Sequence, residues 1–377
     1  MNLGIFESVY GKYPIEEAAK KIREAGFKYI QFNPFFANGG NISPDDITKA
    51  KAKKIKETFE KEGIKIVGIG SYGRFVSPNE EEKNQIIEDT KKWIKLAKDF
   101  GTDLVVTEVG SKHATNNWLD CRENKTAKTW KEVVAVYKDL ATFAAKYKVN
   151  VAIEPHFGQV VKDAKDLRRL LDDVALPNLK VAYDAANSVN AQNEKNQEQA
   201  VNEVFELLEK DIILVHAKDA VIKNKTTEFV QAGQGVIPYR KVLNALKEHN
   251  YNGPVLLEWV EEENVAEVKE YLEEQDALPY MIPLLKSDRE LFENATKALE
   301  LVHSKEGALD LKYRLLLSMV ADALTRHPAG AIACGREALE AGATKEQVVE
   351  AIRVIYTAGG LPSLIENFDL YREVILK

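Results

Sequence analysis

Short apolar segments alternate with longer amphipathic segments over residues 1–275. The apolar segments are rich in β-branched and aliphatic residues, which is typical of buried parallel strands. We predict strands at Asn2–Phe6, Tyr29–Phe32, Lys65–Ile69, Asp103–Thr107, Asn150–Glu154, Lys180–Asp184, Ile212–His216 and Val255–Glu258. Between them, charged and apolar positions recur at helical spacing, for example over 78–100 and 127–147. Eight strand–helix repeats of this length predict a (β/α)₈ TIM barrel over 1–275.

The turns and loops support a barrel over the alternative of an open, doubly wound sheet. Such a sheet normally has a glycine-rich first turn, and Glu7-Ser8-Val9-Tyr10 contains no glycine. Ser43-Pro44-Asp45-Asp46 and Ser77-Pro78-Asn79-Glu80 are typical of helix starts capped by the serine. Three loops that follow predicted strands are long, at 108–126, 185–197 and 219–237, and this favours a binding or catalytic mouth at that end.

The character of the sequence changes after Asp276-Ala277-Leu278-Pro279, which ends the last barrel helix. Residues 280–377 show helical periodicity without strand alternation. Helices are predicted at 286–304, 309–326, 328–341, 344–358 and 362–376, with breaks at Gly342 and Gly359-Gly360. We therefore predict a smaller, all-α domain over 280–377.

Four residues that can bind a metal end four successive predicted strands: Glu154, Asp184, His216 and Glu258. The carboxyl ends of the strands of a parallel barrel converge on one mouth, so these side chains should meet there. Three carboxylates and one imidazole without a thiolate form a hard site for one divalent ion. Mn²⁺ is our first expectation, and Mg²⁺, Co²⁺ and Zn²⁺ remain open. The other interpretation, four solvent-facing charges, requires a coincidence of four strand ends.

Such an ion could chelate a carbonyl and an adjacent hydroxyl of a sugar-like substrate, and stabilise the enediolate that forms when a neighbouring proton leaves. The proton must be removed by a base and returned by an acid. Glu154 and Glu258 end the fifth and eighth strands, so they can approach a substrate from different sides. We expect both to act as ligands and as proton carriers.

Several strings along these strands resemble the xylose isomerase-like family of sugar-phosphate isomerases and epimerases. They are Val151-Ala152-Ile153-Glu154-Pro155-His156, Asp184-Ala185-Ala186-Asn187-Ser188, Val215-His216-Ala217-Lys218-Asp219, Gly233-Gln234-Gly235-Val236-Ile237 and Leu256-Leu257-Glu258. The resemblance covers nearly the whole predicted barrel. It implies Glu154, Asp184, His216 and Glu258 as metal ligands, and places His156, Asn187 and Lys218 near the substrate.

The sequence departs from the ketose 3-epimerase branch of that family at three positions. Val160 stands where the branch has a glutamate, Ile222 where it has an arginine, and Asn187 where it has a histidine. These differences disfavour ketose 3-epimerisation and leave metal-assisted proton chemistry intact. The superfamily also includes dehydratases and other lyases that act on keto-sugars or cyclic polyols with the same kind of site.

Further residues near the mouth each have two interpretations. Glu108, which follows the fourth strand, contacts substrate or forms a structural pair. His156 contacts substrate or donates a hydrogen bond to a ligating carboxylate. Lys218 binds a substrate oxyanion or pairs with Asp219 or Glu258, and Asn187 binds substrate or serves as a turn residue. Four aromatic residues line the pocket or belong to the core: Tyr10, Phe35, Trp118 and Trp259.

The helical region resembles the carboxymuconolactone decarboxylase and alkylhydroperoxidase D-like family in Asp310-Leu311-Lys312-Tyr313-Arg314-Leu315-Leu316 and in 336–344. Peroxidase members carry a Cys-x-x-Cys pair, and those positions hold His327 and Gly330 here. The positions of the family's glutamate and histidine hold Leu315 and Cys334. A dithiol cycle needs two adjacent thiols, so redox activity is not expected. The resemblance implies assembly instead, as a homo-oligomer through these helices.

Charge and composition exclude several other classes of protein. The net charge is −7, which disfavours nucleic-acid and anionic-membrane partners. An endonuclease IV-like enzyme would need many histidines and a basic surface, and the chain has only six histidines. No segment resembles a signal peptide or a membrane span, and Cys121 and Cys334 are expected to be free thiols, so a cytoplasmic protein is predicted.

The sequence therefore favours a divalent-metal-dependent isomerase or epimerase acting on a sugar, keto-sugar or sugar phosphate through an enediolate. A metal-dependent lyase or dehydratase is the first alternative, and the mass of the product discriminates the two. A non-catalytic sugar-binding or assembly protein is the second alternative.

Overall fold

The computed structural model divides the chain into two compact units, Met1–Ala277 and Leu278–Lys377. The structure describes residues 1–34, 40, 42–303 and 307–376. Each unit has a hydrophobic core of its own.

Eight parallel strands close the first unit into a barrel. They are β1 (Leu3–Phe6), β2 (Tyr29–Phe32), β3 (Lys65–Gly70), β4 (Leu104–Thr107), β5 (Asn150–Ile153), β6 (Leu179–Asp184), β7 (Ile212–Ala217) and β10 (Val255–Leu257). The barrel closes where β10 pairs with β1, with Leu3 opposite Val255 and Ile5 opposite Leu257. The prediction of a (β/α)₈ TIM barrel followed by a helical region is confirmed.

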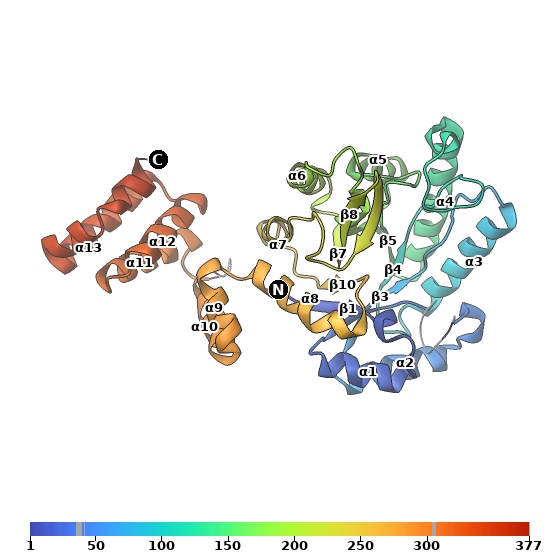
Figure 1. The fold of residues 1–377 in the computed structure, drawn as a ribbon, viewed down its shortest axis with the longest axis horizontal. Coiled ribbons are helices and arrows are strands. Elements are labelled where there is room, and N and C mark those ends of the chain that lie inside the picture. Colours follow the sequence, from blue (N-terminus) through green and yellow to red (C-terminus); the bar gives the residue numbers. More distant parts are fainter. Residues whose placement is uncertain (35–39, 41, 304–306, 377) are drawn as a thin grey trace. The chain divides into compact units, whose positions relative to one another are not determined.

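Among the described residues, seven α-helices connect successive barrel strands and an eighth, α8, follows the last strand, β10. Helices surround the strands in Figure 1. They are α1 (Ile15–Glu24), α2 (Lys49–Lys61), α3 (Glu80–Leu96), α4 (Ala127–Ala145), α5 (Ala164–Val174), α6 (Gln197–Leu208), α7 (Tyr239–Glu248) and α8 (Val265–Asp276). Each buries an apolar face; α5, for example, buries Leu167, Leu170, Leu171 and Val174.

One predicted helix cap is wrong. Asn79, and not Ser77, caps α3, because its side chain accepts hydrogen bonds from the backbone N–H groups of Glu81 and Glu82. Ser77 instead donates to the side chain of Glu82 and accepts from the N–H of Asn79. Ser43 does cap a helix, but only the short 3₁₀ turn Pro44–Asp46, and α2 starts later at a Thr48 cap.

Alternation along the strands decides which side chains point into the barrel. Val151 and Ile153 of β5 pack in the layer between barrel and helices, whereas Ala152 belongs to a small cluster with residues from other strands. That cluster fills the barrel and contains Phe6, Leu104, Val106, Ala152, Ala182, Leu214 and Leu256. Side chains alternate with a period of two, so the residue two positions after each member also points inward. Glu154, Asp184, His216 and Glu258 stand at those positions.

The segment 219–237, which the sequence predicts to be a loop, contains a β-hairpin. Strands β8 (Asp219–Lys223) and β9 (Thr226–Val230) pair antiparallel, with Lys223 opposite Thr226. The turn residues Asn224 and Lys225 both have positive φ angles, 53° and 65°, as a tight hairpin turn requires. Polar residues through the turn interrupt the apolar–polar alternation, so the sequence pattern does not predict these two strands.

The second unit is helical: α9 (Ile282–Ser287), α10 (Arg289–His303), α11 (Leu311–Leu324), α12 (Pro328–Glu340), α13 (Lys345–Glu366) and a short π-helix, Tyr371–Ile375. The segment predicted as one helix over 286–304 is divided at Asp288, and residue 304 lies outside the described residues. Helix α13 continues through the predicted break with a kink at Gly360, where φ is 72°. In length and mean hydropathy (1.3), α13 resembles a membrane span, although Val348, Ile352 and Ile355 pack in the core of this unit.

Candidate metal centre

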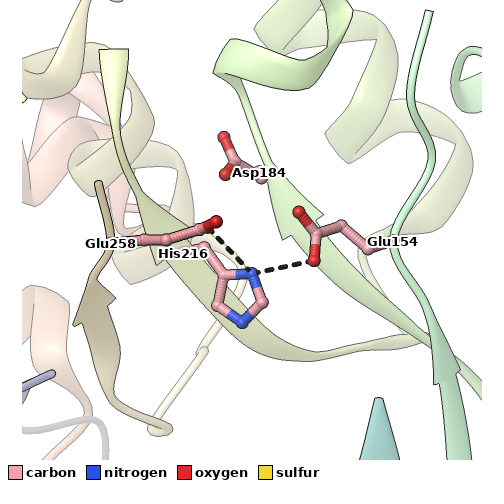
Figure 2. A group of neighbouring side chains, drawn as sticks. All are labelled: Glu154, Asp184, His216 and Glu258. Atoms are coloured by element: carbon pink, nitrogen blue, oxygen red, sulfur yellow. Dashed lines mark ion pairs between the residues drawn. The ribbon is translucent and has the colours of Figure 1, made fainter. Parts of the chain in front are cut away.

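The four ligand-type side chains that end β5, β6, β7 and β10 come together inside the mouth of the barrel, as Figure 2 shows. One donor atom from each of Glu154, Asp184, His216 and Glu258 lies within 4.8 Å of the others. Glu154 and Glu258 stand one residue beyond β5 and β10, and Asp184 pairs with His216 across β6 and β7. The barrel register therefore brings together residues that are more than one hundred positions apart in the sequence.

The ring of His216 is held in a defined orientation. Its Nε2 lies 3.0 Å from Oε1 of Gln31, the buried inward residue of β2. Gln31 donates its own Nε2 to the hydroxyl of Tyr72 at 2.9 Å, so its oxygen is the atom that faces the ring. A neutral His216 thus carries its proton on Nε2 and presents the lone pair of Nδ1 to the carboxylates. Nδ1 lies 3.2 Å from Glu154 Oε2 and 3.7 Å from Glu258 Oε2.

Lys218 supplies a positive charge among the carboxylates. Its Nζ lies 3.1 Å from Asp184 Oδ2, 3.2 Å from Glu258 Oε1 and 3.8 Å from Glu154 Oε1. Of the two structural partners expected from the sequence, Glu258 is therefore in contact. Asp219 is not, because its carboxylate accepts backbone N–H groups of the loop that follows it.

Burial and neighbouring charges change the pKa values of the cluster in different directions. Burial opposes ionisation of Glu154, but His216, Lys218 and the Tyr72 hydroxyl outweigh it and lower the pKa of Glu154 to about 2. For Asp184, burial and the two nearby glutamates outweigh Lys218 and raise the pKa to about 7. Burial opposes the charged form of His216, and the surrounding carboxylates more than offset it, so its pKa is raised.

The donor atoms suit a divalent cation. Asp184 Oδ2, His216 Nδ1 and Glu258 Oε2 are all buried without a hydrogen bond, although Lys218 is close to the first of them. Buried polar atoms that converge without hydrogen bonds are costly unless another group satisfies them. A divalent ion would do so with the oxygen and imidazole ligands that Mn²⁺, Mg²⁺ and Zn²⁺ accept. The residues present therefore fit a bound metal.

The other predicted site residues lie around this cluster. Asn187 donates from Nδ2 to Glu154 Oε1, and its own Oδ1 is buried without a hydrogen bond. His156 is 2% exposed, and its Nε2 is buried without a hydrogen bond. Burial, reinforced by the charge of Lys218, lowers the pKa of His156 to about 3, so the ring is neutral.

Glu108 is outside the group of ligand atoms. It accepts hydrogen bonds from Gln159 Nε2 at 2.6 Å and Asn117 Nδ2 at 3.0 Å. Burial raises the pKa of Glu108 to about 8, against the effect of the Gln159 amide. Glu108 thus forms a hydrogen-bonded group with Asn117 and Gln159.

The four aromatic residues with two interpretations differ in their burial. Trp118 and Trp259 are exposed at the mouth end, whereas Tyr10 is buried in the core between barrel and helices. Phe35 lies outside the described residues. Sequence reasoning missed Gln31, Tyr72, Asn117 and Gln159. The position of Gln31 near the end of an otherwise apolar strand, Tyr29–Phe32, is a signal that could have identified it.

In the second unit, Cys334 Sγ lies 3.8 Å from Asp322 Oδ2, and His327 Nδ1 lies 3.4 Å from Oδ1 of the same residue. Burial, followed by the charge of Asp322, raises the pKa of Cys334 to about 12. The thiol is therefore protonated at neutral pH and is a weak nucleophile.

Comparison with known proteins finds a family match in each unit. The family described as xylose isomerase-like TIM barrel matches residues 19–279, and the chain belongs to this family. The carboxymuconolactone decarboxylase family matches residues 289–372. No curated protein matches the chain.

Solved structures share the fold of the barrel at low sequence identity. A xylose isomerase-like TIM barrel protein from Mycobacterium smegmatis in complex with magnesium is 15% identical, with a TM-score of 0.57 over 73% of this chain and 96% of that one. A 3-keto-D-glucoside 4-epimerase from E. coli is 17% identical, with a TM-score of 0.56 over 72% and 99%. A probable 3-DHS dehydratase from Bacillus anthracis is 15% identical, with a TM-score of 0.57 over 74% and 99%.

Proposed function

We propose that this protein is a divalent-metal-dependent isomerase or epimerase that acts on a sugar, keto-sugar or sugar phosphate through an enediolate, in the cytoplasm. The convergence of four donor residues at the mouth of the barrel, three of them buried and Glu258 half-buried, is the observation that carries this proposal. Membership of the xylose isomerase-like family supports it, since solved relatives include an epimerase and a probable dehydratase.

Glu154, Asp184, His216 and Glu258 would hold the ion, for which we propose Mn²⁺. A bound ion supplies a Lewis acid that polarises a substrate carbonyl and stabilises the enediolate. The protein's part is to align the donors. Gln31 orients His216, while Tyr72 and Asn187 hold the two oxygens of Glu154.

We assign the proton transfers to Glu154 and Glu258. Strands β5 and β10 are separated in the barrel by β6 and β7, so the two carboxylates face the centre of the mouth from different sides. One glutamate can remove a proton from carbon, and the other can return it on the same face or the opposite face. His156, Asn187, Lys218 and Glu108 are proposed to contact the substrate, with Lys218 placed to stabilise a developing oxyanion.

Metal content of the purified protein tests this proposal first. We expect about one divalent ion per chain in the wild type, and its loss in the Glu154→Gln, Glu258→Gln double variant. Glu261→Gln is the matched control, because this exposed glutamate is three positions after Glu258 and outside the cluster. A wild type that binds neither Mn²⁺ nor Co²⁺ would refute the metal-dependent mechanism.

Exchange with solvent tests the chemistry. Candidate keto-sugars incubated with the Mn²⁺-loaded protein in D₂O should gain one deuterium at the carbon beside the carbonyl, as detected by NMR and mass spectrometry. Apart from this deuterium, the product of an isomerisation has the same mass as the substrate. Loss of one water from the product would establish the lyase alternative with the same metal site. Binding without exchange or water loss would indicate a sugar-binding protein.

We further propose that the second unit assembles the protein into a homo-oligomer. Exposed apolar side chains lie on α11 (Tyr313, Leu317 and Leu324) and on α13 (Val354, Leu361 and Ile365). A high density of exposed apolar side chains is consistent with an interface. Light scattering during size-exclusion chromatography should give a mass at least twice that of one chain. The double variant Leu317→Glu, Ile365→Glu should have the mass of one chain. An unchanged mass would show that this face does not form the interface.

A further inference from the structure

Beside the candidate metal centre, polar side chains from four different strands contact one another in a closed ring. Its members are His216, Gln31, Tyr72 and Glu154. Gln31 lies on β2 and His216 on β7. Tyr72 comes two residues after β3, and Glu154 one residue after β5. The two members that are not proposed ligands, Gln31 and Tyr72, therefore connect the two that are.

Each contact in this ring has the length of a hydrogen bond. Nε2 of His216 lies 3.0 Å from Oε1 of Gln31, whose Nε2 donates to the hydroxyl of Tyr72 at 2.9 Å. That hydroxyl donates to Oε2 of Glu154 at 3.0 Å, and the same oxygen lies 3.2 Å from Nδ1 of His216. Gln31 and His216 are 0% and 1% exposed, so protein groups and not bulk water set the direction of these hydrogen bonds.

Packing holds the two aromatic rings of this group in place. The ring of Tyr72 lies so close to the end of β3 that a Cβ on Gly70 would be 2.9 Å from its Cε2. Tyr72 also packs against the apolar cluster that fills the barrel. Phe6, a member of that cluster, meets the ring of His216 edge to face at 4.8 Å between ring centroids. The positions of both rings therefore do not depend on the hydrogen bonds alone.

The single proton of the Tyr72 hydroxyl determines the direction of every hydrogen bond between Glu154 and His216. A carboxylate only accepts, and a hydrogen bond to a charged group is about twice as strong as one between neutral groups, so this proton is donated to Glu154. The phenol oxygen can then only accept from Gln31. The amide must turn its NH₂ group to Tyr72 and its oxygen to His216. A neutral imidazole facing that oxygen carries its proton on Nε2.

Without the hydroxyl, nothing in the ring distinguishes the two ends of the Gln31 amide. The NH₂ group can then turn to Nε2 of His216, and the imidazole proton moves to Nδ1. From there it can be donated to Glu154 or Glu258, whose oxygens lie 3.2 and 3.7 Å from Nδ1. That arrangement suits the cluster of carboxylates, but a nitrogen that carries a proton cannot ligate a metal.

We propose that Tyr72 is a positioning residue that acts through Gln31 to hold the proton of His216 on Nε2. The hydroxyl fixes the orientation of the amide, the amide fixes the tautomer of the imidazole, and Nδ1 is kept free for a divalent ion. The part of this proposal that concerns metal affinity rests on the proposed function. When only a fraction of the protein is in the form that can bind, the apparent dissociation constant rises in inverse proportion to that fraction. Loss of the correct tautomer should therefore be measured as loss of metal affinity.

Nitrogen-15 NMR of the full-length, metal-free protein tests the tautomer without any metal. In alkaline solution, where the ring carries one proton, we expect that proton on Nε2 in the wild type and predominantly on Nδ1 in Tyr72→Phe. The signals of His216 are those that disappear in His216→Asn. Tyr251→Phe is the matched control, because its hydroxyl donates to the carbonyl of Pro254, before β10 at the other end of the barrel. The same tautomer in the wild type and in Tyr72→Phe would overturn the proposal.

Titration calorimetry with Mn²⁺ tests whether Tyr72 acts through Gln31 or only through Glu154. Tyr72→Phe should weaken Mn²⁺ binding about 10–100-fold, as loss of a group that orients a metal ligand typically does. Most of this loss should already be present in Gln31→Leu, so adding Tyr72→Phe to that variant should weaken binding by no more than about threefold further.

Losses that multiply in the double variant would overturn the proposal, because they would show two independent contacts. Unchanged Mn²⁺ affinity in Tyr72→Phe would overturn it as well. Failure of the wild type to bind Mn²⁺ would instead refute the proposed function, and the NMR comparison would still decide whether Tyr72 sets the tautomer of His216.

Discussion

Glu7 is a carboxylic acid that the fold buries completely. It follows β1, has no exposed surface, and neither of its side-chain oxygens has a hydrogen-bond partner. Burial raises the pKa of Glu7 from 4.5 to about 8. The native state therefore keeps a proton that the unfolded chain releases, and the free energy of unfolding falls as the pH rises from about 4.5 to about 8.

We predict that Glu7→Gln removes this pH dependence, because glutamine has a similar shape and cannot ionise. Between pH 5 and pH 8 the wild type should lose on the order of a few kcal/mol more stability than the variant. Urea unfolding followed by tryptophan fluorescence measures this in the barrel alone, since residues 93, 118, 130 and 259 are the only tryptophans. Parallel pH profiles would contradict the prediction.

Gln31 is predicted to increase metal affinity although it is not a proposed ligand. Gln31→Leu leaves Nε2 of His216 without its acceptor, so the ring loses its fixed tautomer and orientation. Changes of this kind typically cost about 10–100-fold in metal affinity. Titration calorimetry with Mn²⁺ measures the loss. Gln85→Leu on the exposed face of α3 is the matched control, and equal affinities in the two variants would contradict the role of Gln31.

At the scale of elements, one buried carboxylate fixes the segment that follows β7. Asp219 is fully buried and accepts hydrogen bonds from the N–H groups of Ala220, Gly233 and Ile237, at 2.9, 3.1 and 3.0 Å. These hydrogen bonds attach the hairpin β8–β9 and the segment 231–237 that follows it to the barrel. Phe229 lies on that hairpin.

Asp219→Ala should loosen the hairpin, because a buried N–H group without an acceptor costs about 1–3 kcal/mol. We expect hydrogen exchange at the amides of Gly233 and Ile237 to accelerate at least tenfold. Glu228→Ala on the exposed surface of the same hairpin is the control. Unchanged exchange at both amides in Asp219→Ala would show that other contacts hold the segment.

Elements with strong local signals could be predicted from the sequence. The eight barrel strands are apolar, β-branched runs, and their predicted bounds agree with the structure within one residue. The β8–β9 hairpin was missed because its pairing depends on a two-residue turn without glycine. The cap of α3 was misassigned because Ser77 and Asn79 are both good capping residues, and only the structure shows which side chain accepts from the first backbone N–H groups of the helix.

For the whole molecule, we predict that metal binding stabilises the first unit only. All four proposed ligands belong to Met1–Ala277. At a free Mn²⁺ concentration one hundred times the dissociation constant, the stabilisation should be about 2.7 kcal/mol. Hydrogen exchange should slow in peptides from 104–260 and stay unchanged in peptides from 311–366. Equal protection of both regions would show that the two units are coupled.

The sequence alone determined the barrel, the helical region after it and the four candidate ligands, because all three rest on local patterns. Strand periodicity, helix breaks and the residue type at each strand end can all be recognised in short stretches of the sequence. The tertiary structure decided which side chains contact the candidate ligands. Strand register placed Gln31 against His216 and Lys218 among three carboxylates, and loop packing left Trp118 and Trp259 exposed beside them. Contacts between residues so far apart in sequence depend on barrel closure, which no local pattern encodes.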